Sequence, residues 1–276
     1  MTKRILLFLL FLSMFLVQPL SAAPKAELWP RWQDHDPAST QVVDHSAWQA
    51  FLDKYLVADH PSGVNRVRYG SVSEADRKSL DRYLGQLQQT PVTQLNRNEQ
   101  MAYWFNFYNA LTIQVVLEHY PVSSIRRINI SPGWFSSGPW GAKLVEVEGE
   151  KLSLDDIEHR ILRPVWQDAR IHYAVNCASI GCPNLQPRAF TAANLDSLLT
   201  AAARQYINHP RGVSFDDGRL QLSSIYEWFQ EDFEDSREGV LRHLQKYAEP
   251  ELAAQLASFD GKISYEYDWS LNDTAP

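Results

Sequence analysis

Cysteine is scarce in this chain, which has two among 276 residues, Cys177 and Cys182. The fold therefore depends on an apolar core, and the roughly 250 residues beyond the N-terminal segment are enough to build one. The chain also lacks an excess of basic charge, because it has 26 Lys and Arg but 33 Asp and Glu, which gives a net charge of −7. This balance argues against a nucleic-acid partner, which a basic stripe would favour. No internal repeat or linker divides the sequence, so we expect one domain.

The first 22 residues have the pattern of a secretory signal peptide. Lys3 and Arg4 precede an apolar run over residues 5–17, and small residues follow as far as Ala22. The run is shorter than the roughly 20 residues of a permanent membrane helix, and no later segment is apolar enough to span a bilayer. No cysteine stands near the cut to carry a lipid. We predict cleavage near Ala22 and a periplasmic or secreted protein with no stable membrane span.

The remaining sequence has the mixed periodicity of an α+β domain. Residues 23–45 carry prolines and tryptophans without a period and predict an extended arm, while residues 46–276 predict a single domain. The pattern over residues 96–120 is apolar on nearly every side and predicts a buried central helix. Surrounding helices and a small, mainly antiparallel sheet complete the fold, for which we consider a papain-like arrangement. The other predicted elements are helices at 46–56, from Ser73, after Ser153 or Asp155, at 191–208, 224–234 and 236–257, hairpins at 144–154 and 213–222, and strands at 171–176 and 262–267.

Both cysteines lie within residues 171–183, where a histidine precedes the first of them by five positions. A thiolate nucleophile needs a nearby base or a positive dipole, and histidine is the natural base near neutral pH. His172 and Cys177 would point to opposite faces of a regular strand, because side chains alternate along it. They meet only if the chain turns at Asn176 or Cys177, and the sequence after Cys177 permits such a turn.

Three other interpretations of this stretch stay open. In the first interpretation, His172 is an ordinary core histidine. In the second, Cys177 and Cys182 close a small disulfide loop. The third is a zinc site in which His172 and both cysteines are joined by His159 or Glu158. Because the gap between the cysteines is wider than the usual knuckle spacing, we assign no metal ligands and expect no cofactor.

Two predicted helices offer partners for a catalytic histidine. Glu99 is placed to orient one from the central helix, although Asn96 followed by Glu99 is also a capping box. Asn106 and Asn109 lie one turn apart on the same buried helix and must find hydrogen-bond partners, either as braces or as the lining of a site. His159, near the start of a short helix, is a second candidate base.

Five blocks of sequence carry a family pattern in order. They are NEQMAYWFNFYNA (98–110), SLDDIEHRILR (153–163), HYAVNC with the later Cys-Pro pair (172–183), LSSIYEWFQEDF (222–233) and YDWSLN (267–272). Together they resemble the DUF547 family, a family of unknown function in bacteria and plants, over roughly residues 70–272. The resemblance implies that Cys177 is the thiol that matters, because the position of Cys182 also holds serine in the family. Histidines at positions 159 and 172 both belong to the pattern, and the position of Glu99 holds either Glu or Gln.

From these residues we predict a thiol-dependent hydrolase or amidase that acts on a peptide or small amide in the cell envelope. Cys177 is the predicted nucleophile and His172 its base, with Glu99 orienting the histidine and His159 in reserve. An oxyanion would face Asn176 or the main-chain N–H groups beside Cys177.

Asn109, Asn176 and Glu158 are predicted to line the substrate site. The alternative function is a non-catalytic binding module, in which the buried polar residues are braces. In that interpretation a tryptophan-rich loop, from Trp134 to Trp140, grips a peptide or sugar partner.

Overall fold

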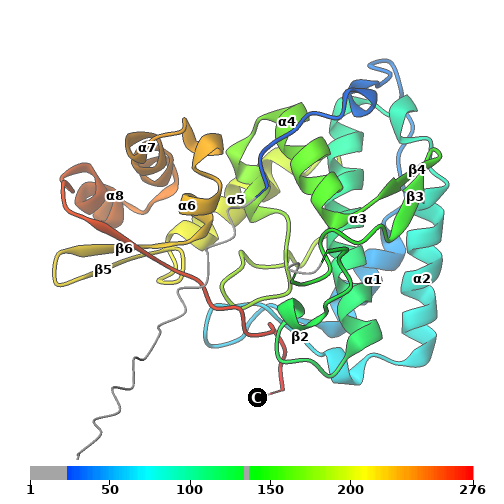
Figure 1. Cartoon of the computed structure of the whole chain (residues 1–276), viewed down its shortest axis with the longest axis horizontal. Coiled ribbons are helices and arrows are strands. Elements are labelled where there is room, and N and C mark those ends of the chain that lie inside the picture. Colours follow the sequence, from blue (N-terminus) through cyan, green and yellow to red (C-terminus); the bar gives the residue numbers. More distant parts are fainter. Residues whose placement is uncertain (1–23, 134–136, 276) are drawn as a thin grey trace, which may run out of the picture.

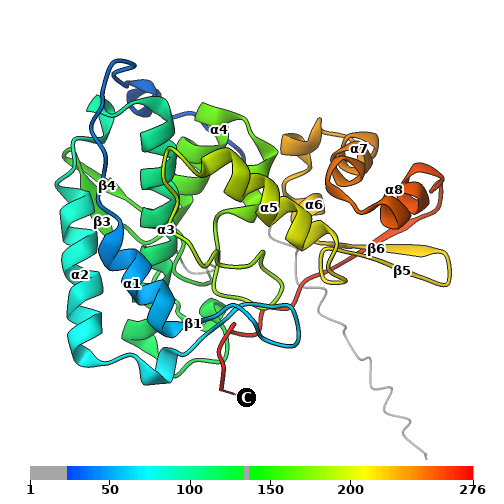
Figure 2. The same ribbon diagram turned by 180° about the vertical axis from the view of Figure 1, so that it is seen from behind.

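The computed structural model describes residues 24–133 and 137–275. Within this part of the chain, eight α-helices and several short 3-10 helices combine with small sheets, so the fold is α+β as predicted (Figures 1 and 2). No helix among the described residues is both long enough and apolar enough to cross a membrane.

The central helix is α3, Arg97–His119, and most of its residues are buried. Asn96 begins the helix by accepting the N–H of Glu99 at 3.0 Å, which satisfies one of the free donors of the first turn. The helix α2, Glu74–Gln88, contacts both α3 and the helix α1, Ser46–Tyr55. The prediction of a buried central helix is confirmed, because neighbours cover its apolar surface on several sides (Figures 1 and 2).

The arm before α1 crosses the surface and inserts one tryptophan into the core. A 3-10 helix, Pro30–Gln33, places Trp32 edge-to-face against Trp104 of α3, with 5.3 Å between the ring centroids. Trp29 packs edge-to-face on Trp32 in turn, at 5.9 Å. Such aromatic pairs add to the burial of apolar area and attach the arm to the central helix.

Two short antiparallel hairpins pack beside the first helices. They are β1 (Leu56–Val57) with β2 (Arg66–Val67), and β3 (Val145–Val147) with β4 (Glu150–Leu152). The second hairpin confirms the prediction for residues 144–154. Its turn, Glu148–Gly149, has positive φ at both positions (47° and 83°), the backbone of a tight hairpin turn in which glycine is favoured.

A widened helical turn follows the second hairpin. Ser153, rather than Asp155, caps it by accepting the N–H of Asp156 at 3.1 Å. The chain then forms a π-helix, Asp156–Leu162, that continues directly into α4, Arg163–Trp166. π-Turns are uncommon and are frequent at functional sites.

The strand predicted over residues 171–176 is wrong. Residues Ala169–Tyr173 form a 3-10 helix, which Asp168 begins by accepting the N–H of Arg170 at 2.9 Å. The apolar run resembled a strand, yet no strand in the described part of the chain pairs with it. The alternation of faces that we assumed for His172 and Cys177 therefore does not apply.

The C-terminal part combines four α-helices with a three-stranded sheet (Figure 1). β6, Arg219–Ser223, pairs antiparallel with β5, Val213–Asp216, and parallel with β7, Ile263–Glu266. The hairpin at 213–222 and the closing strand are thus confirmed. The helices of this part are α5 (Leu195–Ile207), α6 (Ile225–Trp228), α7 (Arg237–Tyr247) and α8 (Pro250–Ala257), with a 3-10 helix at Gln230–Phe233.

The single helix predicted over residues 236–257 is wrong, because α7 and α8 are separate. Pro250 has no N–H to continue a helix, and its ring disfavours helical backbone at Glu249. The structure accordingly gives Glu249 an extended conformation (φ −66°, ψ 157°). The helix predicted over residues 224–234 divides in the same way into α6 and the 3-10 helix that follows it.

The buried apolar residues form two clusters that meet close to Cys177. The larger one contains α1, α2 and α3, and the smaller one contains the end of α5, the three-stranded sheet and α7. Tyr173 and Ala174 are adjacent in sequence but belong to different clusters. The stretch that carries both cysteines therefore runs along the junction of the two clusters.

Candidate active site

The turn that carries Cys177 is held by the side chain of the residue before it. Asn176 accepts the N–H of Ala178 at 2.9 Å and donates to the carbonyl of Pro183 at 2.7 Å. Ala178 has φ +58° and is fully buried, a left-handed conformation that is uncommon for a residue with a Cβ. The chain thus turns sharply at the candidate nucleophile, and two side-chain hydrogen bonds maintain the turn.

Asn109 of α3 supports the same turn from below. Its Nδ2 donates to the carbonyl of Ala174 at 2.9 Å, and its Oδ1 accepts the N–H of Asn176 at 2.8 Å. These are the main-chain groups that a neighbouring strand would otherwise satisfy. Asn106, one turn earlier, holds the N–H and carbonyl of Phe190 in the same manner. Both asparagines of the central helix are therefore braces.

The predicted oxyanion site is not formed by these groups. The N–H of Cys177 donates to the sulfur of Cys182 at 3.1 Å, and the N–H of Ala178 donates to Asn176. The amide of Asn176 is itself bonded on both sides. An oxyanion would have to displace one of these bonds, and the role of Asn176 stays a prediction.

Neither cysteine forms a disulfide. Cys177 is half-buried, and Cys182 is buried. The Cys177 sulfur lies 3.1 Å from the hydroxyl of Tyr267 and 3.2 Å from that of Ser179. The Ser179 hydroxyl donates to the Tyr267 oxygen at 3.0 Å, which leaves the Tyr267 proton for the sulfur. Hydrogen bonding with Cys182, and then with Ser179 and Tyr267, holds the pKa of the Cys177 thiol below its ordinary value, although burial opposes the change. Burial raises the pKa of Cys182 instead, so the two thiols differ in reactivity.

Tyr267 belongs to a cluster of partly exposed aromatic rings beside the thiol. Its ring centroid lies 4.8 Å from that of Trp228 and 4.6 Å from that of Trp269. Trp140 packs on Trp269 at 5.7 Å. The predicted binding residue Trp134 lies outside the described residues, so only Trp140 of that loop is placed in this aromatic cluster.

His172 does not contact Cys177; it forms a buried pair with a carboxylate. Its Nε2 lies 2.7 Å from Oδ2 of Asp232, and its ring stacks on Phe229 with 4.3 Å between centroids. Burial lowers the pKa of His172, although the bond to Asp232 opposes this. Burial raises the pKa of Asp232, but the bond and charge of His172 and the charge of Arg163 outweigh it and bring that pKa to about 2. Within residues 24–133 and 137–275, no histidine is hydrogen-bonded to Cys177, so the papain-like pairing of a cysteine with a histidine is not formed there.

Glu158 links the histidine electrostatically to the thiol. One carboxylate oxygen accepts the Tyr108 hydroxyl at 3.0 Å, and the other lies 3.9 Å from Nδ1 of His172. Burial raises the pKa of Glu158 to about 7; the charge of Arg163 opposes the rise and the charge of Cys177 adds to it. The protonation of Glu158 near neutral pH therefore depends on the charge of Cys177.

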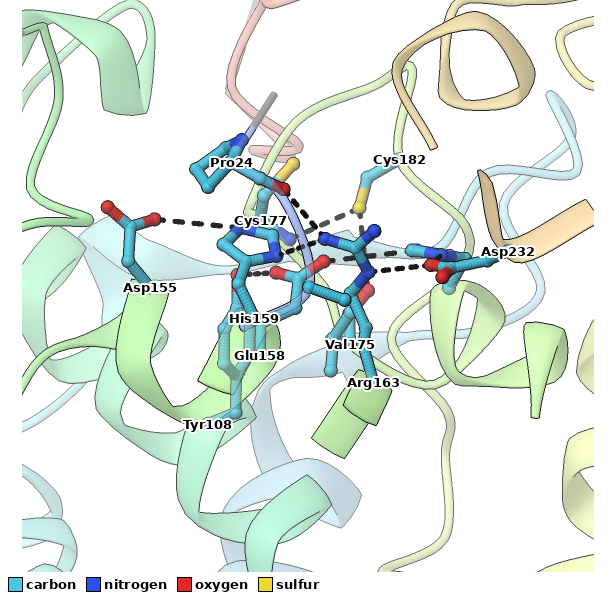
Figure 3. A network of polar contacts seen from close by, with 12 residues as sticks. Pro24, Tyr108, Asp155, Glu158, His159, Arg163, Val175, Cys177, Cys182 and Asp232 are labelled. Atoms are coloured by element: carbon cyan, nitrogen blue, oxygen red, sulfur yellow. Dashed lines mark hydrogen bonds and ion pairs between the residues drawn. The ribbon is translucent and has the colours of Figure 1, made fainter. Parts of the chain in front are cut away.

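Arg163 occupies the centre of this network, between His159 and Asp232 (Figure 3). Its side chain is 1% exposed and contacts Oδ2 of Asp232 and Oε1 of Glu231, each at 2.6 Å. It also donates to Nδ1 of His159 at 3.0 Å and to the carbonyl of Pro24 at 2.8 Å. Burial and then Arg163 hold the pKa of His159 well below its ordinary value. His159 is consequently a neutral acceptor for Arg163.

Glu99 was predicted to orient the catalytic histidine, but its carboxylate is bonded to the arm instead. Its carboxylate is buried and accepts the main-chain N–H of Val43 at 2.7 Å. The carboxylate thus fastens the arm to the start of α3, and the partner of His172 is Asp232 instead.

Sequence reasoning missed Ser179, Tyr267 and Asp232. The last two lie in the fourth and fifth sequence blocks, which marked them as part of a pattern without indicating a role. No group of three or more His, Cys, Asp or Glu side chains within residues 24–133 and 137–275 is arranged to hold a metal ion. The zinc interpretation therefore has no support in the described residues.

In the candidate site, the α+β fold places a half-buried cysteine beside a network of histidine, carboxylate and arginine side chains. Residues 92–207 match the model of the family described as "Protein of unknown function, DUF547". The match includes Cys177, His172 and Glu158 but not Asp232 or Tyr267, which lie beyond its last residue. No curated protein and no solved structure matches the chain.

Proposed function

We propose that this protein is a thiol-dependent hydrolase in which Cys177 attacks the carbonyl carbon of a peptide or small amide. The observation that carries the proposal is the Tyr267 hydroxyl, which donates to one sulfur and is itself held by the hydroxyl of Ser179. The hydroxyls of Tyr267 and Ser179 lie 3.1 and 3.2 Å from that sulfur, at a turn whose next residue has a left-handed backbone. Donors that stabilise a thiolate give a nucleophile at neutral pH without a base in direct contact.

The reaction proceeds in two displacements. The Cys177 thiolate adds to the carbonyl carbon, the C–N bond breaks, and the amine leaves with a proton while a thioester forms. Water then cleaves the thioester, which releases the carboxylic acid, restores the thiolate and returns the remaining proton of the water to the group that protonated the amine. Burial raises the pKa of Tyr267 well above its ordinary value, so its hydroxyl stays protonated and stabilises the thiolate as a donor.

Glu158 is the proposed source of the proton for the amine. Its pKa of about 7 leaves it partly protonated at neutral pH, and the charge of Cys177 raises that pKa. Loss of the thiolate charge on forming the thioester therefore makes Glu158 more acidic at the stage when the amine needs a proton. His172, held by Asp232, takes the role of positioning Glu158 and exchanging this proton with it.

The test is acylation of the protein by a 4-nitrophenyl ester, followed by mass spectrometry of the digested chain. We expect one acyl group on the peptide that contains Cys177, absent from Cys177→Ala and present in Cys182→Ala. Equal acylation of the wild type and Cys177→Ala would remove Cys177 as the nucleophile and with it the proposal.

The aromatic cluster supports a second candidate, a binding module without catalysis. Trp140, Trp228, Tyr267 and Trp269 are all partly exposed, and such rings commonly contact peptide side chains or sugars. Under this alternative, Trp269→Ala weakens ligand binding while Cys177→Ala leaves it unchanged, and no acyl-enzyme forms with any ester.

We also propose that the protein is exported. The support is the basic and apolar pattern of residues 1–22, which lie outside the described residues. N-terminal sequencing of protein recovered from the cell envelope or medium should begin at Ala23. Recovery of the uncut chain from the cytoplasm alone would contradict export.

A further inference from the structure

The arm segment Pro24–Trp29 runs over the polar network and is held through its main chain. The N–H of Ala26 donates to Oε1 of Glu231 at 2.9 Å, and the carbonyl of Pro24 accepts from Arg163 at 2.8 Å. The N–H groups of Glu27 and Trp29 donate to the carbonyls of His159 and Arg160, at 2.9 and 3.0 Å. The side chains from Pro24 to Leu28 are exposed, so the main chain is what this surface recognises.

A proline explains why a helical carbonyl is free to accept the arm. In a regular helix, the N–H of residue 164 would bond to the carbonyl of Arg160 in an α pattern, or to that of His159 in a π pattern. Position 164 is proline and has no N–H. The missing N–H leaves one of these two carbonyls without its helical donor, and the passing extended chain donates to both of them.

The two charged side chains complete a surface that is complementary to a peptide. Arg163 presents a buried donor for a carbonyl, and Glu231 presents a carboxylate for an N–H, while both also bond to each other at 2.6 Å. We name the surface formed by the carbonyls of His159 and Arg160 with these two side chains the peptide strip. Its partners in the arm are three N–H groups and one carbonyl. The N–H groups of Glu27 and Trp29, two positions apart, bond to the helical carbonyls, and the N–H of Ala26 and the carbonyl of Pro24 bond to the two side chains, the alternation of an extended main chain.

We propose that the peptide strip is a binding site for an extended peptide and that the chain's own arm occupies it in cis. This inference extends the proposed function by naming an extended peptide as the substrate class, because Arg163 connects the strip to Glu158 and the Cys177 site. A tethered segment competes at an effective concentration in the millimolar range. A peptide in trans therefore binds weakly until the arm is released.

The experiment measures binding of a fluorescein-labelled hexapeptide, PKAELW, to the full chain by fluorescence anisotropy. The arm is released by the double substitution Ala26→Pro and Glu27→Pro, which removes two of its N–H donors. Two hydrogen bonds of ordinary strength correspond to a gain in affinity of about tenfold or more over the wild type. Leu28→Pro is the matched control, because the N–H of Leu28 takes no part in these bonds, and it should bind the peptide as the wild type does.

A second peptide, N-methylated at the positions of Ala26 and Glu27, should bind neither chain. Amide hydrogen exchange gives an independent readout on the unsubstituted chain, where saturating PKAELW should speed exchange at Ala26 and Glu27. Equal binding of the plain and N-methylated peptides, or no gain for the released arm and no change in exchange, would overturn the proposal. Cys177→Ala in the released chain should keep peptide binding and lose acylation. The anisotropy measurement therefore tests the peptide strip, and acylation tests the proposed hydrolase, independently of each other.

Discussion

The hydroxyl of Tyr267 lies 3.1 Å from the sulfur of Cys177, although 90 positions separate them in the sequence. Tyr267 directly follows β7, and a 2.8 Å hydrogen bond from the N–H of Gly181 to the carbonyl of Asp268 ties the two segments together. A Cβ on Gly181 would come within 2.8 Å of the Asp268 nitrogen. Glycine at this position therefore permits the close approach that brings the tyrosine to the thiol.

Tyr267→Phe should make the Cys177 thiol less acidic. Removing a donor to the thiolate is worth about 1.5–3 kcal/mol, or about one to two pKa units, so the thiolate fraction at pH 7 falls. Greater intrinsic nucleophilicity offsets part of this loss. We expect iodoacetamide labelling at pH 7 to slow about three- to tenfold, and the labelling midpoint to move to higher pH. Tyr265→Phe, on the strand β7 that precedes Tyr267, should match the wild type.

Asn109→Ala should lower both the stability of the fold and the reactivity of the thiol. The change leaves the buried main-chain groups of Ala174 and Asn176 without partners, at a cost of about 3 kcal/mol. Asn106→Ala is the matched control, because it removes the hydrogen bonds to the main chain of Phe190 rather than those to the Cys177 turn. Urea unfolding should show similar losses for both variants, whereas thiol labelling should slow only for Asn109→Ala. Equal labelling of the two variants would show that the Asn109 brace does not set the geometry of the thiol.

Glu158→Gln should change how stability depends on pH. Burial raises the pKa of Glu158 to about 7 in the folded protein, whereas in the unfolded chain it is near 4.3. The folded wild type therefore holds a proton between these values that the unfolded chain has lost, and its stability falls relative to the variant as pH rises through this window. The difference between the two proteins should change by about 3 kcal/mol between pH 4 and pH 8.

Urea unfolding followed by tryptophan fluorescence at several pH values measures this difference. Glu251→Gln, a change at an exposed position of α8, should give a profile parallel to that of the wild type. A gap between the wild type and Glu158→Gln that stays constant with pH would contradict the raised pKa.

Arg163→Ala should be among the most destabilising single changes in the network. It leaves Asp232 and Glu231 without their cationic partner, and removing one member of a buried ion pair typically costs about 3–5 kcal/mol. Arg160→Ala, three positions earlier, removes a half-exposed pair with Asp156 and a contact with the ring of Trp29. That change should cost about 1 kcal/mol, so thermal unfolding should separate the two variants clearly.

Local patterns predicted the elements whose partners are close in sequence. The buried helix over residues 96–120 follows from apolar residues on all its sides, and the hairpins at 144–154 and 213–222 follow from their turn residues. The strand at 171–176 was wrong because an apolar run is ambiguous between a strand and a buried turn. Asn109, more than sixty positions away, decides between them by binding the main chain there.

The sequence by itself determined the buried central helix and the hairpins at 144–154 and 213–222, and it supplied Cys177, His159 and His172 as candidates for the site. Only the tertiary structure decided the partners of each group. His172 bonds to Asp232 rather than to Cys177, Glu99 holds the arm, and Cys177 meets Tyr267. The physical reason is that composition and spacing specify which chemical groups are present, whereas hydrogen bonds and pKa shifts depend on distances that close only when segments far apart in the chain pack together.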